Sequence, residues 1–264
     1  MGALWATLGK IASDRGSGAA EIARAAAGAL SSVPENDVRT AVRLLLEGHP
    51  SMAPLWRLAT NVLSAAGPRD GAAAFLAGVE ADAAAATVLA PILPPWLLTI
   101  SYSSSVIESL RTARVSQLTC MRSDPGGEGA RMSEAVAPTR ARVIDDDEAI
   151  AHIPAAAVVV GADAVTPSHL INKVKTRALA EAAREKGVPS YVVAGHSKFV
   201  DSNLPIEGPF ERVPLELFTA IATPTGLNSP AEASERAAGA HLHPELASLL
   251  SELFRAAGRP GGSL

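Results

Sequence analysis

The sequence predicts an α/β protein, with an N-terminal helical domain at residues 1–93 and a parallel sheet covered by helices on both faces at residues 94–264. Up to about residue 90, apolar residues recur at helical spacing. From Pro94 onward, short and nearly continuous apolar runs alternate with helical stretches, a pattern typical of buried parallel strands. The chain has 264 residues, of which 48% are hydrophobic, so it is long enough to bury a large core.

The N-terminal region is expected to be helical throughout. Its second helix begins after a turn at Asp14 and Ser17, two residue types that cap helices. The next helix starts at Pro34 and ends at Gly48, which follows the usual preference for proline at helix starts and glycine at helix ends. The expected helices cover residues 16–33, 34–50, 52–67 and 70–93.

The C-terminal region is expected to alternate between strands and helices. Strands are predicted at residues 96–100, 116–121, 141–144, 156–160, 190–194 and 217–223. Helices are predicted at residues 103–114, 128–136 and 168–187, and a last helix at residues 243–258.

Composition excludes several classes of function. The net charge of -4 provides no basic surface for nucleic acid or anionic membrane, and 4% aromatic residues leave few side chains to stack on bases. A single cysteine excludes an internal disulfide and a cysteine-built zinc site. The N-terminus lacks the long apolar region of a signal peptide, and charges and prolines interrupt the apolar window at residues 71–100. We therefore expect a cytoplasmic protein that binds neither membranes nor nucleic acid directly.

Polar residues follow three of the predicted strands, where ligands bind in open parallel sheets. Ser101–Ser105 run into a helix, Arg122–Gly129 form a turn with both charge signs, and Asp163 follows the strand at 156–160. Asn172 and Lys173 are expected near the start of the next helix, where an amide and an ammonium group can hold a phosphate or a sugar. Each feature alone also fits a structural role, such as helix capping or a local ion pair. Together they predict a small-ligand site.

The residues from 158 to 199 resemble a family signature: Gly-Ala-Asp, a short loop, Asn-Lys-x-Gly-Thr, a helix, Gly-x-Pro, then a strand and a lysine. The family comprises the alpha, beta and delta subunits of eukaryotic translation initiation factor 2B, ribose-1,5-bisphosphate isomerase and methylthioribose-1-phosphate isomerase. Weaker similarity extends over nearly the whole chain. The resemblance implies an N-terminal helical domain, a Rossmann-like C-terminal domain that carries the ligand pocket, and dimers formed largely through the latter.

The resemblance also implies roles for individual residues. Asp163 matches the aspartate of the isomerases' cysteine–aspartate acid/base pair, and Ser101 stands where they carry the cysteine. The expected residues for binding substrate or phosphate are Arg15, Gly16, Ser17, Ser103, Glu128, Gly129, Arg131, Asn172 and Lys173.

The departures from the family pattern bear on chemistry. A serine hydroxyl is far less acidic than a thiol, so Ser101 cannot replace the cysteine without an activating neighbour. His49 stands where an arginine is expected, Lys175 replaces the glycine of Asn-Lys-x-Gly-Thr, and Arg122–Pro125 replace Glu-x-Arg-Pro. Cys120 lies on the neighbouring strand, where it is either a relocated thiol or a buried packing residue.

Three hypotheses follow. The first is a protein that binds a sugar phosphate or nucleoside monophosphate without isomerase chemistry. The second is an active aldose–ketose isomerase of a pentose phosphate that uses Asp163, and the third is an assembly subunit with a vestigial pocket. A homodimer or higher homo-oligomer is expected. No G-x-G-x-x-G motif follows a strand and the histidines are scattered, so neither a nicotinamide cofactor nor a metal is expected.

Overall fold

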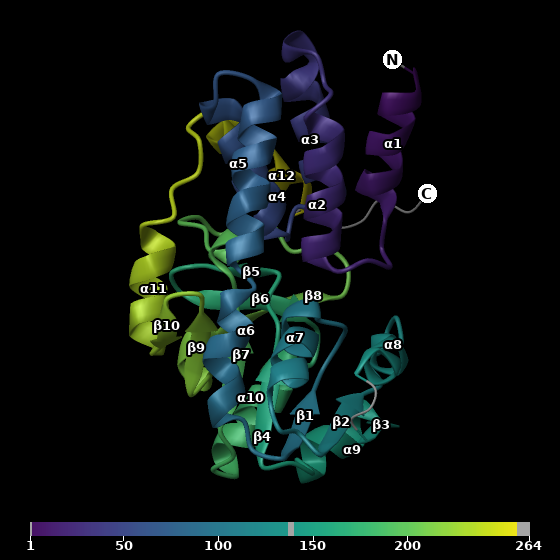
Figure 1. The fold of residues 1–264 in the computed structure, drawn as a ribbon, viewed down its shortest axis with the longest axis vertical. Helices are drawn as coiled ribbons and strands as arrows, with labels where there is room; N and C mark the ends of the chain where they lie inside the picture. Colours follow the sequence, from purple (N-terminus) through teal and green to yellow (C-terminus); the bar gives the residue numbers. More distant parts are fainter. Residues whose placement is uncertain (1, 137–139, 258–264) are drawn as a thin grey trace.

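A computed structural model describes residues 2–136 and 140–257. The N-terminal helices lie at one end of the long axis and the large sheet with its helices at the other (Figure 1). The helices at the first end are α1 Gly2–Ser13, α2 Ala19–Leu30, α3 Val38–Gly48, α4 Ala53–Ser64 and α5 Pro68–Ala81. Their apolar faces share one core around the fully buried Trp56.

The large sheet has seven strands in the order β10-β9-β7-β4-β1-β2-β3. All neighbours pair in parallel except β9 and β10 at one edge. The strands are β1 Trp96–Thr99, β2 Gln117–Met121, β3 Arg140–Ile144, β4 Ala157–Val160, β7 Ser190–Val193, β9 Ala220–Thr223 and β10 Gly226–Asn228. The predicted fold class is confirmed, and each of the six predicted strands has its counterpart.

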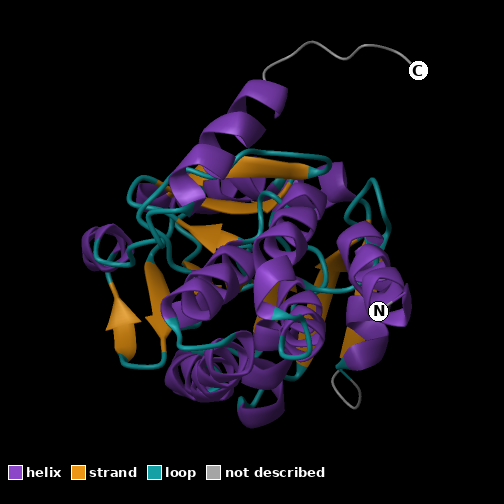
Figure 2. Cartoon of the chain, turned by 90° about the horizontal axis from the view of Figure 1, so that it is seen from above, coloured by secondary structure: helices purple, strands orange, loops and turns teal. Residues whose placement is uncertain are grey.

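Alternate residues of the central strands point to opposite faces of the sheet, as the geometry of a strand requires. Leu98, Val158 and Val160 pack against α9 Asp146–His152, α10 Thr176–Glu185 and α11 Pro230–Ala238. Leu97, Val159 and their neighbours pack against α6 Ala84–Leu89, α7 Ser104–Thr112 and α8 Glu128–Ala135. Seen from above, helices lie beside the strands on more than one side, and some strands reach the edge of the molecule (Figure 2).

A second sheet lies between the N-terminal helices and the large sheet (Figure 1). Its antiparallel strands are β5 Ala164–Val165, β6 His169–Lys173 and β8 Phe210–Pro214. Ala164 and Ile171 join the core of the N-terminal helices, whereas Val165 and Leu170 join the core of the large sheet.

The second sheet corrects one sequence-based prediction. The helix expected at residues 168–187 starts only at Thr176, because residues 169–173 form β6. Asn172 and Lys173 therefore lie at the end of a strand rather than near the start of a helix. Every residue of β6 is buried, and such a short buried strand carries no polar and apolar alternation that would mark it in the sequence.

The C-terminal helix α12 Leu246–Ala257 returns to the N-terminal helices. Leu246 and Leu249 belong to the core of those helices. Two ion pairs attach α12 and the turn before it to α3, Arg39 with Glu245 at 2.7 Å and Arg43 with Glu252 at 2.6 Å. The domain boundary at residue 93 stays a prediction, but residues 246–257 do not pack on the large sheet.

By length and composition alone, the helical stretch Pro68–Ile92 could cross a membrane. The mean hydropathy of its most apolar 18 residues is 1.5. The sequence predicts no membrane span here, because charges and prolines interrupt the apolar residues. In the fold this stretch comprises α5, α6 and a short turn, and α5 packs against α2 and α4. Asp82, between the two helices, accepts hydrogen bonds from the N–H groups of His196 and Ser197.

Two glycines of α5 differ in their surroundings and provide a test of the packing. A methyl group at Gly71 would lie 2.5 Å from Val62 Cα, whereas nothing lies within 4 Å of a methyl group at Gly78. We predict that Gly71→Ala lowers the melting temperature by about 2–10 °C, since overpacking costs about 1–3 kcal/mol. Gly78→Ala should raise the melting temperature slightly, because alanine is more favourable than glycine inside a helix by about 0.5–1 kcal/mol. Thermal unfolding followed by circular dichroism measures both, and equal shifts would contradict the α4–α5 packing.

Candidate functional site

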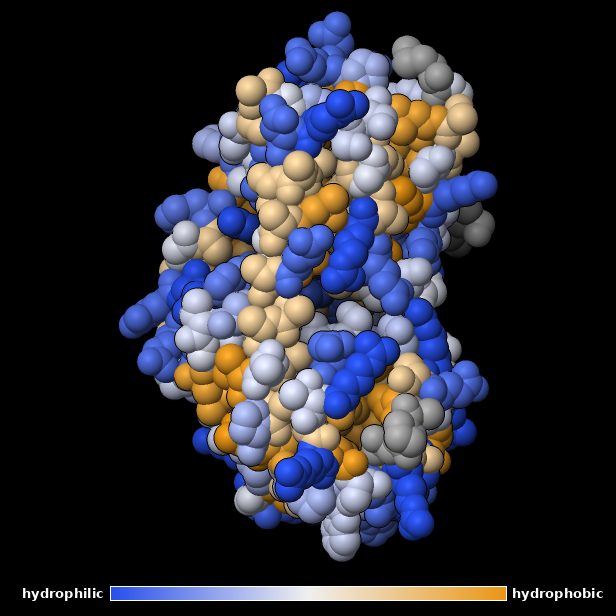
Figure 3. Space-filling model, in the orientation of Figure 1, coloured by the Kyte–Doolittle hydropathy of each residue, from blue (hydrophilic) through white to orange (hydrophobic). Residues whose placement is uncertain are grey.

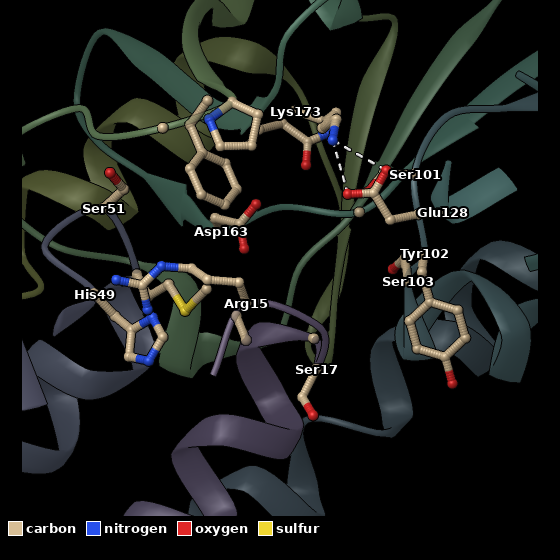
Figure 4. A pocket seen from close by; sticks show the side chains of 18 of the residues that line it. Arg15, Ser17, His49, Ser51, Ser101, Tyr102, Ser103, Glu128, Asp163 and Lys173 are labelled. Carbon is tan, nitrogen blue, oxygen red and sulfur yellow. Dashed lines mark hydrogen bonds and ion pairs between the residues drawn. The ribbon is translucent and has the colours of Figure 1, made fainter. Parts of the chain in front are cut away.

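A cavity of about 390 Å³ lies between the N-terminal helices and the carboxyl ends of β1 and β4 (Figure 4). β1 and β4 are neighbours, but the chain continues from β1 toward one edge of the sheet and from β4 toward the other. The loops that follow them therefore diverge and leave a crevice, the usual place for a ligand in an open parallel sheet. Ser101 and Asp163 come from these two loops.

The cavity brings together nine of the eleven residues proposed from the sequence. Segments from both parts of the chain contribute to its wall. The nine are Arg15, Gly16, Ser17, Ser101, Ser103, Glu128, Asp163, Asn172 and Lys173. Gly129 and Arg131 lie outside the lining.

Asp163 lies near the middle of the cavity, between Arg15 and the pair formed by Lys173 and Glu128 (Figure 4). Its backbone N–H donates to the carbonyl of Ile171, and its carbonyl accepts from Ala53, so both halves of the molecule hold it. Burial raises the pKa of its carboxyl group to about 6, while the charges of Lys198 and Lys173 oppose this rise. Asp163 therefore exchanges protons close to neutral pH.

Lys173 and Glu128 form an ion pair inside the cavity. The Nζ atom of Lys173 lies 2.7 Å and 3.0 Å from the two carboxylate oxygens of Glu128, and it also contacts the carbonyl of Pro125. Only 2% of the Lys173 side chain is exposed, against 28% of the Glu128 side chain, so water reaches the pair mainly from the side of Glu128. The pair connects the end of β6 to the start of α8, and it compensates the charge of Lys173.

Lys198 lines the cavity but was not among the residues proposed from the sequence. It ends a short 3-10 turn, His196–Lys198, and is only 7% exposed. In the described part of the chain, its Nζ atom has neither a hydrogen bond nor an ion pair. Burial lowers its pKa, and the carboxylates of Asp163 and Asp82 oppose this shift. The family signature ends in a lysine after the strand at 190–194, which was the available signal for this residue.

The N–H groups of the loop before α2 form hydrogen bonds within the loop itself. Asp14 Oδ1 accepts hydrogen bonds from Gly16 at 2.8 Å and Ser17 at 3.0 Å, so these two N–H groups are already engaged. The first turn of α2 has no side-chain cap, and Ala19 and Ala20 at this end line the cavity. The helix thus directs its positive end toward the cavity.

A second helix start lies on the opposite wall. Ser103 caps α7 by accepting from the N–H of Val106 at 3.3 Å, and Ser104 and Ser105 line the cavity with the first turn. Gly161 makes room for this cap, because a methyl group there would lie 2.3 Å from Ser103 Oγ. The ends of α2 and α7 therefore both present partial positive charge to the same space.

His49 occupies the place of an expected arginine and lines the cavity. Its Nε2 atom lies 2.7 Å from the carbonyl of Ile11. Burial lowers the pKa of the imidazole, and the charge of Arg15 adds to this, while the hydrogen bond to Ile11 opposes it. The pKa is lowered overall, which favours the neutral form at pH 7. His49 therefore does not replace the positive charge of the arginine.

Gly129 and Arg131 support the cavity from behind. A methyl group at Gly129 would lie 1.9 Å from the carbonyl oxygen of Met121, so the glycine permits close packing of α8 on β2. Arg131 donates to the carbonyl of Gly16 at 2.6 Å, pairs with Glu21 at 3.2 Å and stacks on Tyr102 at 3.7 Å from the ring centre. It connects α8 to the loop that carries Arg15 rather than lining the cavity itself.

Other residues discussed from the sequence lie outside the lining. Arg122 pairs with Asp124 at 2.9 Å and with Asp145, so the apparent exchange of charges forms a local network. Lys175 has the left-handed φ of 76° that explains a glycine in the family pattern, and its ammonium group lies 3.2 Å from Asp147. Lys175 therefore neither crowds the cavity nor lines it.

Cys120 is a packing residue. It is fully buried in the core between the sheet and α7, and burial raises the pKa of its thiol to about 12. At neutral pH it carries no thiolate, and it does not line the cavity. Among the described residues, no three side chains of His, Cys, Asp or Glu are grouped to hold a metal ion.

A side cavity of about 340 Å³ adjoins the first one. Lys198, Tyr102, Ser104 and Ser105 line both cavities. The remaining wall of the side cavity comes mainly from α2, α7 and the turn between α5 and α6, and the molecular surface is hollowed between the two halves (Figure 3). Lys198 is thus reachable from two directions.

Comparisons with known proteins agree with the resemblance in the sequence. The model of the initiation factor 2 subunit family matches residues 94–230, which is more than half of the chain. No protein among curated sequences matches at a significant level.

Three solved structures illustrate the similarity in fold. A translation initiation factor eIF-2B from Pyrococcus horikoshii OT3 superposes with a TM-score of 0.76 and 25% identity, over 86% of this chain and 97% of that one. The tetrameric eIF2B-beta2-delta2 complex from C. thermophilum has a TM-score of 0.70 and 17% identity, over 90% and 93%. 5-Methylthioribose 1-phosphate isomerase from Pyrococcus horikoshii OT3 has a TM-score of 0.66 and 19% identity, over 96% and 88%.

The electrostatics of the cavity can be measured on Asp163. We predict a titration midpoint near pH 6 for its carboxyl carbon in a ¹³C NMR titration, assigned by its loss in Asp163→Asn. Lys198→Met should raise this midpoint, because the ammonium charge of Lys198 stabilises the carboxylate. Lys10→Met, on the exposed side of α1, is the control and should leave it unchanged. A midpoint near 4 in the wild type would show that Asp163 is solvated.

Proposed function

The chain belongs to the initiation factor 2 subunit family, and we propose that it binds a phosphorylated small molecule, a sugar phosphate or a nucleoside monophosphate, without isomerase chemistry. One observation carries the proposal. The cavity combines two helix N-termini and the ammonium group of Lys198, a residue that is only 7% exposed, with Ser101 in the place of a cysteine.

The preference for a phosphate follows from the charges around the cavity. The N-terminal turns of α2 and α7 favour anions through their partial positive charge and free N–H groups. Lys198 and Arg15 form no ion pair within the described residues, and a buried ammonium group is costly without a counter-charge. A phosphate between these groups would supply it. Asp163 and Asn172 then remain to hold hydroxyl groups of the sugar.

The proposed lack of isomerase activity follows from the acid/base groups. Moving a carbonyl between adjacent carbons needs one group that takes a proton and another that donates one. Asp163 can exchange a proton near neutral pH. Ser101 cannot serve as its partner, because its hydroxyl is a very weak acid and no base in the described residues accepts from it. Cys120 is buried outside the cavity.

One observation favours the second candidate, an aldose–ketose isomerase of a pentose phosphate. The pKa of about 6 at Asp163 is suited to a general acid or base, and it occurs inside the cavity. The similarity to 5-methylthioribose 1-phosphate isomerase, at 19% identity, supports a shared fold only. Conversion of ribose 1,5-bisphosphate or a methylthioribose phosphate to its ketose, lost in Asp163→Asn, would replace the first proposal by this one.

We also propose that the protein works in the cytoplasm as a homodimer or higher homo-oligomer. A structural neighbour is a tetrameric complex, which supports assembly as a property of this fold. Trp96 on β1 and Val143 on β3, the strands on either side of β2, are 58% and 40% exposed, as expected for residues that a second subunit covers. Light scattering after size-exclusion chromatography measures the mass, and a monomer at micromolar concentration would contradict the proposal.

Ligand binding is tested by thermal shift with ribose 5-phosphate, ribose 1,5-bisphosphate and nucleoside monophosphates. A ligand at 100 times its dissociation constant stabilises the folded state by about 2.7 kcal/mol, which corresponds to about 5–10 °C. We predict such a shift for at least one of these compounds, without detectable ketose product in ³¹P and ¹³C NMR. Lys198→Gln should abolish the shift, because the phosphate loses its buried counter-charge.

Lys10→Gln is the matched control, since it removes an exposed lysine that does not line the cavity. No shift with any compound would support an assembly subunit with a vestigial pocket and would contradict ligand binding. An equal shift in wild type and Lys198→Gln would place the phosphate elsewhere.

A further inference from the structure

Three loops around the cavity hold a residue in the left-handed backbone region. Among the described residues, four that are not glycine have positive φ, and three of these are Ser101 at 64°, Ser123 at 68° and Lys175 at 76°. This conformation costs free energy in any residue with a Cβ atom. Surrounding interactions must therefore hold the loops that follow β1, β2 and β6, and such strain is typical of functional sites.

Asp146 contacts two of these loops directly. It is the first residue of α9, is only 1% exposed and does not line the cavity. Its Oδ1 atom accepts the N–H of Ser123 at 2.7 Å, and its Oδ2 atom accepts the N–H of Asp124 at 2.9 Å. The ammonium group of Lys175 lies 3.4 Å from Oδ2.

The third loop is reached through Ser123. The hydroxyl group of Ser123 accepts the N–H of Ser101 at 2.7 Å and donates to the carbonyl of Met121 at 3.0 Å. The hydroxyl is fully buried, so water does not compete for these bonds. Asp146 thus fixes Ser123, and Ser123 fixes the residue that stands where the isomerases carry their cysteine.

We propose that Asp146 is a positioning residue that holds three walls of the cavity in place without touching the ligand. The walls are the loop at 101–105, the turn at 125–128 and the end of β6 at 172–173. The expected effect on ligand affinity rests on the proposed function, whereas the effect on the loops does not.

The two neighbours of Asp146 in the sequence have other roles. Asp145 caps α9 by accepting from the N–H groups of Asp147 and Glu148, and it pairs with Arg122. Asp147 also lies near Lys175, at 3.2 Å, but its side chain is 85% exposed. Asp147 is therefore a matched control, since it shares the ion pair but accepts nothing from the turn after β2.

The two hydrogen bonds that Asp146 accepts require a carboxylate at this position. Two oxygens accept two backbone N–H groups, and an asparagine offers one oxygen and one NH₂ group. In Asp146→Asn, one backbone donor therefore faces another donor inside the protein, which leaves a buried N–H group without a partner. Asp147→Asn creates no such conflict.

The experiment compares amide hydrogen exchange in wild type, Asp146→Asn and Asp147→Asn by NMR, at a temperature well below unfolding. We expect Asp146→Asn to speed exchange at Ser123 or Asp124 and at Ser101 by about tenfold or more, since local opening becomes easier. Asp147→Asn should leave all three within about twofold of wild type. Unchanged exchange at Ser101 in a folded Asp146→Asn protein would overturn the proposal.

Affinity for ribose 5-phosphate, measured by calorimetry on the same proteins, gives a second readout. We expect a dissociation constant at least about tenfold higher in Asp146→Asn and within about twofold of wild type in Asp147→Asn. Of these two residues, only Asp146 accepts hydrogen bonds from the turn that continues into the cavity wall. If wild type does not bind this probe, the proposed function is weakened and the exchange data alone decide the inference. An unchanged dissociation constant in a folded Asp146→Asn protein would count against the positioning role of Asp146.

Ser123→Ala keeps the test valid if Asp146→Asn fails to fold. It removes the acceptor for Ser101 and leaves the bonds from Ser123 and Asp124 to Asp146 intact. Exchange should then rise at Ser101 alone. A uniform rise at all three positions, or none at Ser101, would contradict the chain of contacts from Asp146 to Ser101.

Discussion

The reversal of strand order between β1 and β4 is the constraint on which the site depends. The chain moves from β1 to β2 and β3 in one direction and from β4 to β7 and β9 in the other, so the loops after β1 and β4 diverge and leave a gap between them. The N-terminal helices and the second sheet then cover this gap. Residues more than a hundred positions apart, such as Arg15 and Asp163, therefore line the same cavity.

The large sheet and most of the cavity residues could be predicted from the sequence, because their signals are local. Continuous apolar runs mark buried parallel strands, and polar residues directly after them mark the edge where ligands bind. The second sheet escaped prediction because β5 and β6 are short and buried on both faces, so the sequence predicts a helix at Asn172 and Lys173. Lys198 was missed since its importance comes from burial without a partner, which is a three-dimensional property.

Arg131 shows a different limit of sequence reasoning. A glycine, one intervening residue and an arginine match the family pattern, but a pattern cannot distinguish a side chain that binds a ligand from one that holds the loop beside it. Here the guanidinium group donates hydrogen bonds to Gly16 and Glu21, and its flat face stacks on the ring of Tyr102. It couples α8 to the N-terminal loop across 115 positions of sequence. The cavity is therefore closed partly by contacts that would form without any ligand.

The arrangement of charges bears on the proposal of ligand binding without catalysis. Lys173 is compensated by Glu128, and Asp14 is satisfied by two backbone N–H groups, so these residues need no ligand for their own stability. Lys198 and Asp163 differ, because the cost of burying each charge is offset only in part by nearby charges. Lys198 and Lys173 offset it for Asp163, and Asp163 and Asp82 offset it for Lys198. An anion beside Lys198 lowers that cost and also favours the protonated form of Asp163 through repulsion. Such a ligand would bind while placing Asp163 in the state that donates a hydrogen bond, and a neutral hydroxyl at Ser101 then has no base to complete a proton transfer.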